Sequence, residues 1–249
     1  MSSNFQIDIT SLGLKKNYLY EIIATTLSID KHLMVPNTAS MGIRIVDEKN
    51  IDIRPYPNTT TYKNIEKSKF IILNFVDDVY LYALASLKGS NLSKSYKGLS
   101  EDYYNFLTLR VNKEYMDFAH KISSSDSIRL PYLKNAWAIV VCVATNETQV
   151  QKLDNFGKIE LMALNLAVIS YEKFKESFKL YNRAENLALE TIILATKLRV
   201  AGEKKDETLI RTIKNKIDEN YNEIYRFGKN LSALKTIEFI QDYIEELED

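Results

Sequence analysis

The chain has 249 residues, of which 45% are hydrophobic and 27% charged, as is usual for a globular protein. Its 33 basic residues are balanced by 33 acidic ones, whereas nucleic-acid-binding proteins usually carry a basic excess, so no nucleic-acid partner is expected. The single cysteine, Cys142, excludes an internal disulfide, and the sequence shows neither a signal peptide nor an apolar run of the ~20 residues that a membrane-spanning helix needs. We therefore expect a cytoplasmic protein without a membrane partner.

The first part of the chain has the residue pattern of β-strands. Residues 18–28 are rich in isoleucine, threonine and tyrosine, which favour strands. Residues 40–56 contain two Ile-x-Ile segments on either side of the turn sequence DEKN, and this alternation predicts a hairpin. Residues 70–76 form a short apolar run, typical of a strand that is covered on both faces.

A helix is expected after the apolar run, with Asp77 or Asp78 as its N-cap and Gly89 as its end. Residues 88–127 are polar and mostly loop-like, although Ser100 followed by two acidic residues predicts the start of a short helix.

Strand character returns at residues 135–145. Residues 159–173 contain helix-forming residue types, but we interpret them as the return strand of a hairpin with residues 136–144. From about residue 181 the pattern becomes helical, and a first helix is expected to end at Gly202. A second, amphipathic helix is predicted from the apolar residues spaced by three or four between Ile210 and Phe227, and it is expected to end at Gly228. The sequence therefore predicts an α+β protein, with a β-rich domain over residues 1–178 and an α-helical domain over residues 179–249.

A cluster of hydroxyl groups follows the predicted hairpin. Thr59, Thr60 and Thr61, together with backbone N–H groups at a turn, could surround an anion, and Arg54 could add a charge-assisted bond to a phosphate. The alternative is that the threonines are β-branched residues at a strand edge and that Asn64 caps a short helix. Spacing alone favours this alternative.

A second candidate site is the segment of small residues at 38–42. Small side chains allow a ligand to approach the backbone closely. The alternative, which spacing again favours, is a plain loop that leads into a strand.

Catalytic motifs are largely missing from the sequence. His32 and His120 lie far apart and lack metal-ligand spacing, so no metal site is expected. Cys142 lies in an apolar strand, where a cysteine usually acts as a small hydrophobic residue. Phosphate-binding glycine motifs, a nucleophile elbow and a zinc-protease motif do not occur. If the protein is an enzyme, a cofactor is expected to supply the difficult chemistry.

Several segments together resemble a known family. The stretches EIIATTLS, NTASMGI, IDIRPY, TTTYKNI, IILNFVDD and NRAENLALETIILATKL are similar to an archaeal family of flavin-reductase-like proteins that was long catalogued as a domain of unknown function. The resemblance implies an antiparallel split β-barrel that binds FMN, followed by a small helical domain, and a homodimer. At Lys197 the family pattern suggests arginine, and lysine would give a weaker anion contact because it lacks the planar fork.

The resemblance also implies which residues bind FMN. A turn at residues 37–42 would lie along the isoalloxazine ring, a group around Arg54 would hold the phosphate, two asparagines would fix these loops or touch the ligand, and three residues of the helical domain would cover the site. The expected cofactor-binding residues are Asn37, Thr38, Ala39, Ser40, Met41, Gly42, Arg54, Thr60, Thr61, Tyr62, Asn64, Asn74, Asn182, Arg183 and Lys197.

Three functions are compatible with the sequence. The first is an FMN-dependent oxidoreductase that passes hydride or electrons between a nicotinamide-type donor and a small acceptor. The second is a non-catalytic FMN-binding module that carries or senses flavin. The third is an interaction protein in which the amphipathic helix of residues 206–227 faces a partner and the barrel is only a scaffold.

Overall fold

The chain folds into two compact units. The first comprises residues 1–76 and 100–177, and the second residues 77–99 and 178–249. By its contacts, the segment 77–99 thus groups with the helices, whereas the division from sequence placed it in the β-rich domain. The computed structural model describes residues 7–30, 33–89, 98–123, 125–154, 157–177, 183–226 and 231–248.

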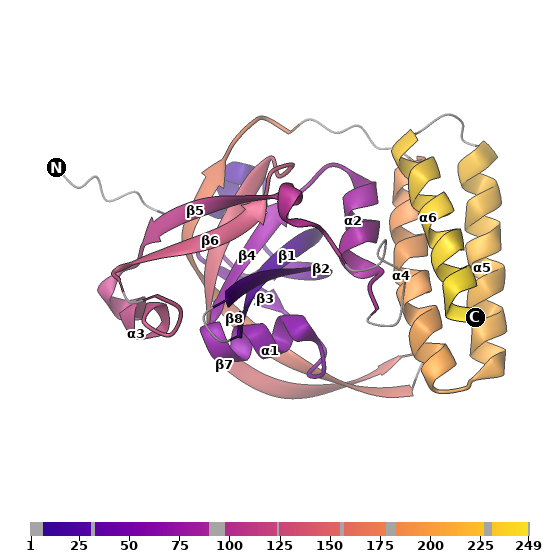
Figure 1. The fold of residues 1–249 in the computed structure, drawn as a ribbon, viewed down its shortest axis with the longest axis horizontal. Helices are drawn as coiled ribbons and strands as arrows, with labels where there is room; N and C mark the ends of the chain where they lie inside the picture. Colours follow the sequence, from indigo (N-terminus) through magenta and orange to yellow (C-terminus); the bar gives the residue numbers. More distant parts are fainter. Residues whose placement is uncertain are drawn as a thin grey trace. The chain divides into compact units, whose positions relative to one another are not determined.

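The first unit is built on a closed antiparallel barrel with the strand order β1-β2-β3-β8-β7-β4 (Figure 1). Neighbouring strands are antiparallel throughout. The α+β barrel expected from the sequence is therefore confirmed. The six strands are β1 (Leu19–Asp30), β2 (Leu33–Ile45), β3 (Asn50–Ile53), β4 (Phe70–Phe75), β7 (Ala138–Asp154) and β8 (Gly157–Lys173).

The strand register confirms the two predicted hairpins. In the first, Ile43 pairs with Ile53 and Ile45 with Ile51, so that the isoleucines share the buried face. In the second, β7 pairs with β8 over its whole length, and residues 159–173 are therefore strand and not helix. Strand propensity and the pairing partner outweigh the helix-forming residue types there.

Three expectations about the candidate site segments are wrong. Residues 37–42 are not a turn or loop but part of β2, where they pair with residues 21–26 of β1. The threonines at 59–61 do not lie at a strand edge, because Thr59 is the N-cap of helix α1 (Thr60–Ser68). Asn64 lies inside this helix and does not cap it.

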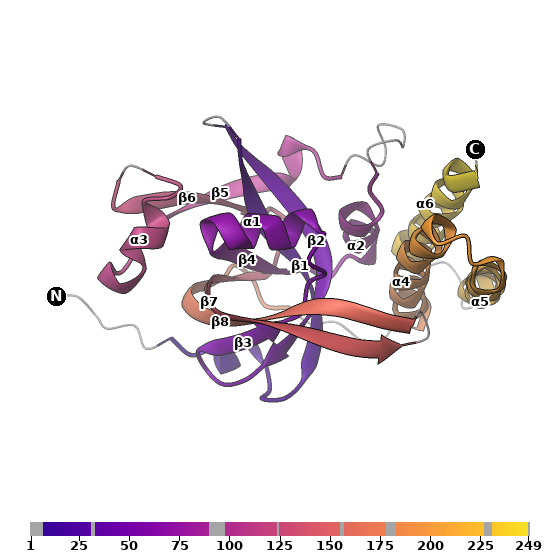
Figure 2. The ribbon, with the colours of Figure 1, turned by 90° about the horizontal axis from the view of Figure 1, so that it is seen from below.

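Helix α1 is closed at both ends by local hydrogen bonds. The Thr59 hydroxyl accepts a bond from the Tyr62 N–H, and Lys69 ends the helix with a left-handed backbone, φ 64°, while its N–H donates to the Ile65 carbonyl. The helix packs on β1 and β2 (Figure 2), and Tyr62 and Ile65 join the core of the barrel. A side-chain N-cap of this type is typical of threonine.

A two-stranded sheet accompanies the barrel. Strand β5 (Tyr104–Arg110) pairs antiparallel with β6 (Ser127–Leu133), and β6 packs on β1 and β4. A 3-10 turn at Glu101–Tyr103 stands where a short helix after Ser100 was expected. The remaining short helical elements of this unit are η1 (Ile9–Leu12), η4 (Lys113–Tyr115) and α3 (Met116–Ala119).

The second unit contains the short helix α2 and the longer helices α4, α5 and α6. The three longer helices run alongside one another (Figure 1), and α2 packs on α4 and α6. Asp78 caps α2 as predicted, but the helix ends at Ser86 and does not reach Gly89. The Asn220 amide donates to the Thr191 hydroxyl at 3.1 Å and so ties α5 to α4. Among the described residues, no helix has both the length and the apolar character needed to cross a membrane. The helices are α2 (Val79–Ser86), α4 (Arg183–Glu203), α5 (Glu207–Arg226) and α6 (Leu231–Glu248).

Candidate phosphate site at the start of helix α1

The first turn of α1 presents open hydrogen-bond donors. The Tyr62 N–H is bonded to the Thr59 hydroxyl at 3.3 Å, and the Lys63 N–H to the Thr59 carbonyl at 3.1 Å. The N–H groups of Thr60 and Thr61 make no hydrogen bond within the part of the chain that the structure describes. Such amides, together with the positive end of the helix dipole, favour an anion.

Basic side chains lie close in sequence to these open amides. Arg54 follows β3 and is exposed, and its guanidinium makes no ion pair or hydrogen bond with any described residue. Lys63 on α1 is likewise exposed and unpaired among the described residues. A guanidinium binds a phosphate through two parallel hydrogen bonds, so the segment from Arg54 to Thr61 has the donors that a phosphate monoester requires.

A network of buried and partly buried polar side chains fixes α1 to β1 and β2. The Asn37 amide donates to the hydroxyls of Thr61, at 3.2 Å, and Thr26, at 3.4 Å. The Asn64 amide donates to the same Thr26 hydroxyl at 3.1 Å. These contacts bring together three of the predicted site residues, and they add Thr26, which the sequence analysis missed because its TT pair looks like ordinary strand sequence.

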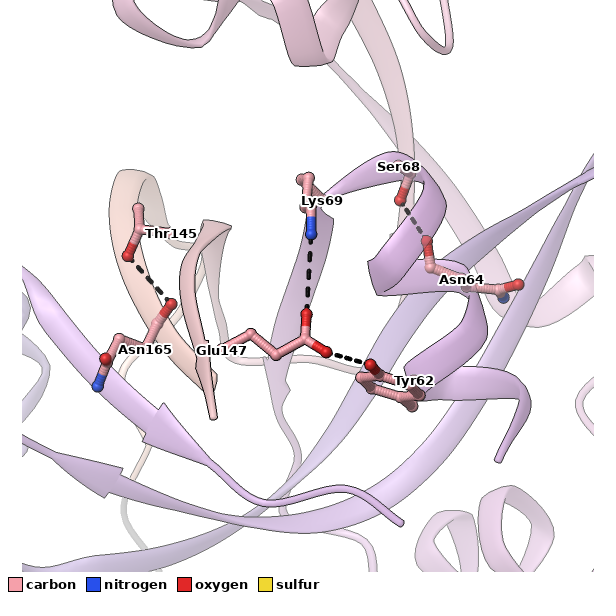
Figure 3. A network of polar contacts seen from close by, with 7 residues as sticks. All are labelled: Tyr62, Asn64, Ser68, Lys69, Thr145, Glu147 and Asn165. Atoms are coloured by element: carbon pink, nitrogen blue, oxygen red, sulfur yellow. Dashed lines mark hydrogen bonds and ion pairs between the residues drawn. The ribbon is translucent and has the colours of Figure 1, made fainter. Parts of the chain in front are cut away.

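Tyr62 has no donor left for a ligand. Its N–H is bonded to Thr59, and its hydroxyl donates to the Glu147 carboxylate on β7 (Figure 3). This hydrogen bond, together with burial and the negative charge of Glu147, raises the pKa of Tyr62 to about 12. Glu147 also lies 3.9 Å from the Lys69 ammonium. Tyr62 therefore supports the first turn of α1 and does not bind a ligand through these groups. Glu147 and Lys69 were not predicted as site residues, because no motif in the sequence marks them.

The backbone groups of alternate residues in the segment 37–42 point to the two edges of β2. The Ile45 N–H donates to the Tyr18 carbonyl on the β1 side, so by alternation the backbone groups of Thr38, Ser40 and Gly42 point to the opposite edge of β2. A Cβ at Gly42 would lie 3.3 Å from Glu21 and 3.3 Å from Leu19. The contacts with β1 alone therefore explain why position 42 has a residue without a side chain.

Asn74 is a structural residue. Its side chain is fully buried, its amide donates to the Ile23 carbonyl at 2.7 Å and to the Thr25 hydroxyl at 2.9 Å, and its oxygen accepts from the Leu133 N–H at 2.8 Å. Asn74 was expected either to fix neighbouring segments or to touch the ligand. The structure shows the first role, since Asn74 joins β4 to β1 and to β6.

The remaining predicted residues are Ala39 and Met41, on β2, and three residues near or on α4. Asn182 lies outside the described residues. Arg183 and Lys197 lie on α4 of the second unit, and their contribution to a flavin site stays a prediction. Within the described residues, no group of His, Cys, Asp and Glu side chains could hold a metal ion.

Comparisons with known proteins place these features in context. The family model described as "Protein of unknown function (DUF447) N-terminal domain" matches residues 20–172. A crystal structure of the FMN-bound protein MM1853 from Methanosarcina mazei, a DUF447 protein, is similar over 95% of this chain and 100% of its own, with 20% identity and a TM-score of 0.66. At this identity the likeness shows the fold alone.

Two flavin reductases give weaker matches. A putative flavin reductase from Haemophilus somnus matches 63% of this chain and 82% of its own, with 15% identity and a TM-score of 0.40. The styrene monooxygenase flavin reductase from Pseudomonas putida matches 62% and 80%, with 9% identity and a TM-score of 0.40. No curated protein matches the chain.

Proposed function

Since the chain belongs to the DUF447 family of proteins of unknown function, whose N-terminal domain model matches residues 20–172, we propose that its barrel binds FMN. The observation that carries this proposal is the pair of amides at Thr60 and Thr61, which follow the exposed Arg54 closely in sequence; neither these amides nor the Arg54 guanidinium has a partner among the described residues. A member of the family that was crystallised with FMN supports the choice of ligand.

The phosphate of FMN is assigned to the start of α1. The amides of Thr60 and Thr61 and the exposed hydroxyl of Thr60 supply neutral donors, and Arg54 supplies the charge. Asn37 holds the Thr61 hydroxyl and therefore acts on this site through Thr61. Tyr62 is not counted among the phosphate ligands, because both of its donors are already bonded.

The flavin ring is assigned to the edge of β2 at residues 37–42. Antiparallel alternation directs the backbone groups of Thr38, Ser40 and Gly42 to this edge, and short side chains permit a planar ring to approach the strand. The ring would thus be contacted mainly by backbone, which is compatible with a strand in place of the expected turn.

FMN, when bound, supplies the capacity to accept and release a hydride or single electrons. We propose an oxidoreductase of this kind, with a nicotinamide-type donor and a small acceptor, in a cytoplasmic homodimer. The chain's own contribution is to bind the phosphate, to orient the ring along β2 and to hold it with backbone hydrogen bonds. A flavin carrier or sensor without turnover is the alternative, favoured by the scarcity of acid–base side chains among the described residues of the proposed site.

Flavin binding is tested by titrating the purified protein with FMN and following flavin fluorescence and the visible absorbance. We expect quenching of the fluorescence and a shift of the absorbance bands. The absence of both at a large excess of FMN would refute the proposal. Anaerobic mixing of the loaded protein with NADH or NADPH then separates the two functions, since bleaching of the flavin indicates an oxidoreductase and a stable spectrum indicates a carrier or sensor.

A further inference from the structure

One carboxylate on β7 contacts both ends of α1. Glu147 accepts a hydrogen bond from the Tyr62 hydroxyl with one oxygen, and its other oxygen lies 3.9 Å from the Lys69 ammonium (Figure 3). Tyr62 lies in the first turn of α1, and Lys69 is the residue that ends the helix. A single side chain therefore connects the two ends of the helix to the barrel wall.

A β-bulge places Glu147 on the side of β7 that faces α1. Ala144 pairs with Leu166 and Asn146 with Asn165, so Thr145 is an extra residue, and its hydroxyl donates to the Asn165 carbonyl at 3.2 Å. A bulge shifts the alternation of side chains by one position. Glu147, and not Asn146, thus follows Ala144 on the face that carries the core.

The contact is partly shielded from water and carries no net charge. The Tyr62 ring belongs to the barrel core, while the side chains of Glu147 and Lys69 are 32% and 25% exposed. A hydrogen bond to a carboxylate is shorter and stronger than a neutral one, and Lys69 offsets the negative charge that Glu147 would otherwise bring toward a bound phosphate.

The position of Tyr62 also determines where the open amides point. Thr60 and Thr61 immediately precede Tyr62 in the same helical turn, so any rotation of Tyr62 about the helix axis moves their N–H groups. Asn37 holds Thr61 from the β2 side, and Glu147 holds Tyr62 from the β7 side. The first turn of α1 is therefore held from two strands that are not neighbours in the barrel.

We propose that Glu147 and Tyr62 are positioning residues that set the preference of this protein for phosphorylated over unphosphorylated flavin. Neither touches the ligand. They fix the first turn of α1 so that the amides of Thr60 and Thr61 meet the phosphate. This inference rests on the proposed function, because it takes FMN as the ligand and the start of α1 as its phosphate site.

The measurement is the ratio of the Kd for riboflavin to the Kd for FMN, for the wild-type protein, for Tyr62→Phe, Glu147→Ala and Glu147→Gln, and for the double variant Tyr62→Phe/Glu147→Ala. Each of Tyr62→Phe and Glu147→Ala should lower the ratio by about fivefold or more, mainly through weaker FMN binding. The double variant should lower it no further, because both changes break one contact. Glu147→Gln keeps an acceptor for the Tyr62 hydroxyl and should keep most of the ratio.

Glu160→Ala is the matched control, since Glu160 is an exposed glutamate on β8 of the same hairpin without a polar contact to the described residues. A general loss of folding would weaken binding of both flavins alike and leave the ratio unchanged. Should Glu147→Ala fail to fold, Tyr62→Phe, which removes a single oxygen atom, decides the question.

Two results overturn the inference in distinguishable ways. If the wild-type protein prefers FMN and both Tyr62→Phe and Glu147→Ala keep that preference, the positioning role is wrong and the proposed function stands. If the wild-type protein binds the two flavins equally or binds neither, the phosphate site itself is wrong, and the positioning role fails with it.

Discussion

Arg54 is the charged residue on which the proposed phosphate site depends most. It is exposed and unpaired among the described residues, so its replacement breaks no internal contact. A hydrogen bond to a charged group contributes about 1.5–3 kcal/mol. Arg54→Ala should therefore weaken FMN binding about tenfold or more and leave riboflavin binding and the melting temperature almost unchanged.

Fluorescence titration with both flavins checks this expectation, with Arg110→Ala at the exposed end of β5 as the matched control. An Arg54→Ala protein that binds FMN as tightly as the wild type would show that the phosphate lies elsewhere.

Some residues of the proposed site could be suggested from the sequence, and others could not. Arg54, Thr60 and Thr61 could be proposed because hydroxyls, amides and a guanidinium are recognisable phosphate donors wherever they cluster. The buried Cys142 was also interpreted correctly, as a small hydrophobic residue of a core strand. Glu147 could not be found, because its partner Tyr62 lies 85 residues away in sequence and only the bulge at Thr145 turns it toward α1.

The tyrosine at the centre of the network gives a pH-dependent stability. The hydrogen bond to Glu147 raises the pKa of Tyr62 from 10.0 to about 12 in the folded protein. Between these values the folded state keeps a proton that the unfolded chain releases, so the stabilisation is complete below pH 10.0 and is lost as the pH rises to about 12.

Urea unfolding of the wild-type protein and of Tyr62→Phe over this pH range measures the effect. The difference between their free energies of unfolding should shrink as the pH rises, because the variant has no group to titrate at this position. A difference that does not change between pH 10.0 and about 12 would mean that the hydroxyl is not held by Glu147 in solution.

Helix α1 is the element whose start determines the site. Thr59 caps it through a hydroxyl that accepts the Tyr62 N–H, and loss of such a cap typically costs about 1 kcal/mol. Thr59→Ala should lower the stability by about this amount and weaken FMN binding, since the first turn loses its local anchor. Thr59→Ser keeps the hydroxyl and should restore both properties. Chemical denaturation and flavin titration of the two variants provide the test, and equal FMN affinity of Thr59→Ala and Thr59→Ser would contradict the assigned role.

The barrel strands could be predicted from alternation and from apolar runs, whereas the start of α1 at Thr60 and the strand at 37–42 could not. Threonine favours strands by propensity, so three in a row suggest a strand edge, yet the first of them is also a good N-cap. The segment 37–42 contains small and polar residues that suggest a loop, and the pairing with β1 overrides this local preference.

The two units of the molecule call for separate stability measurements. In the helical unit, burial and then the nearby charge of Arg199 lower the pKa of Lys88 from 10.5 to about 8. The folded state therefore releases this proton earlier than the unfolded chain. The contribution of Lys88 to stability should rise as the pH increases from about 8 to 10.5 and should be complete above 10.5.

Lys88→Met removes the titrating group while it keeps an unbranched side chain. The stability of the variant relative to the wild type should be most favourable below pH 8 and should decline toward pH 10.5. Hydrogen exchange of the helical unit over this range measures the difference. A constant difference would show that Lys88 is not desolvated in solution.

At the scale of the whole molecule, we propose that the start of α1 binds the phosphate of FMN as a dianion. Phosphorus NMR of FMN bound to the wild-type protein tests it most directly, because a free phosphate monoester takes up a proton near pH ~6. We expect a bound resonance that keeps the dianion position as the pH falls below this value, since the Thr60 and Thr61 amides and Arg54 favour the charged form. A resonance that titrates as in free FMN would contradict it.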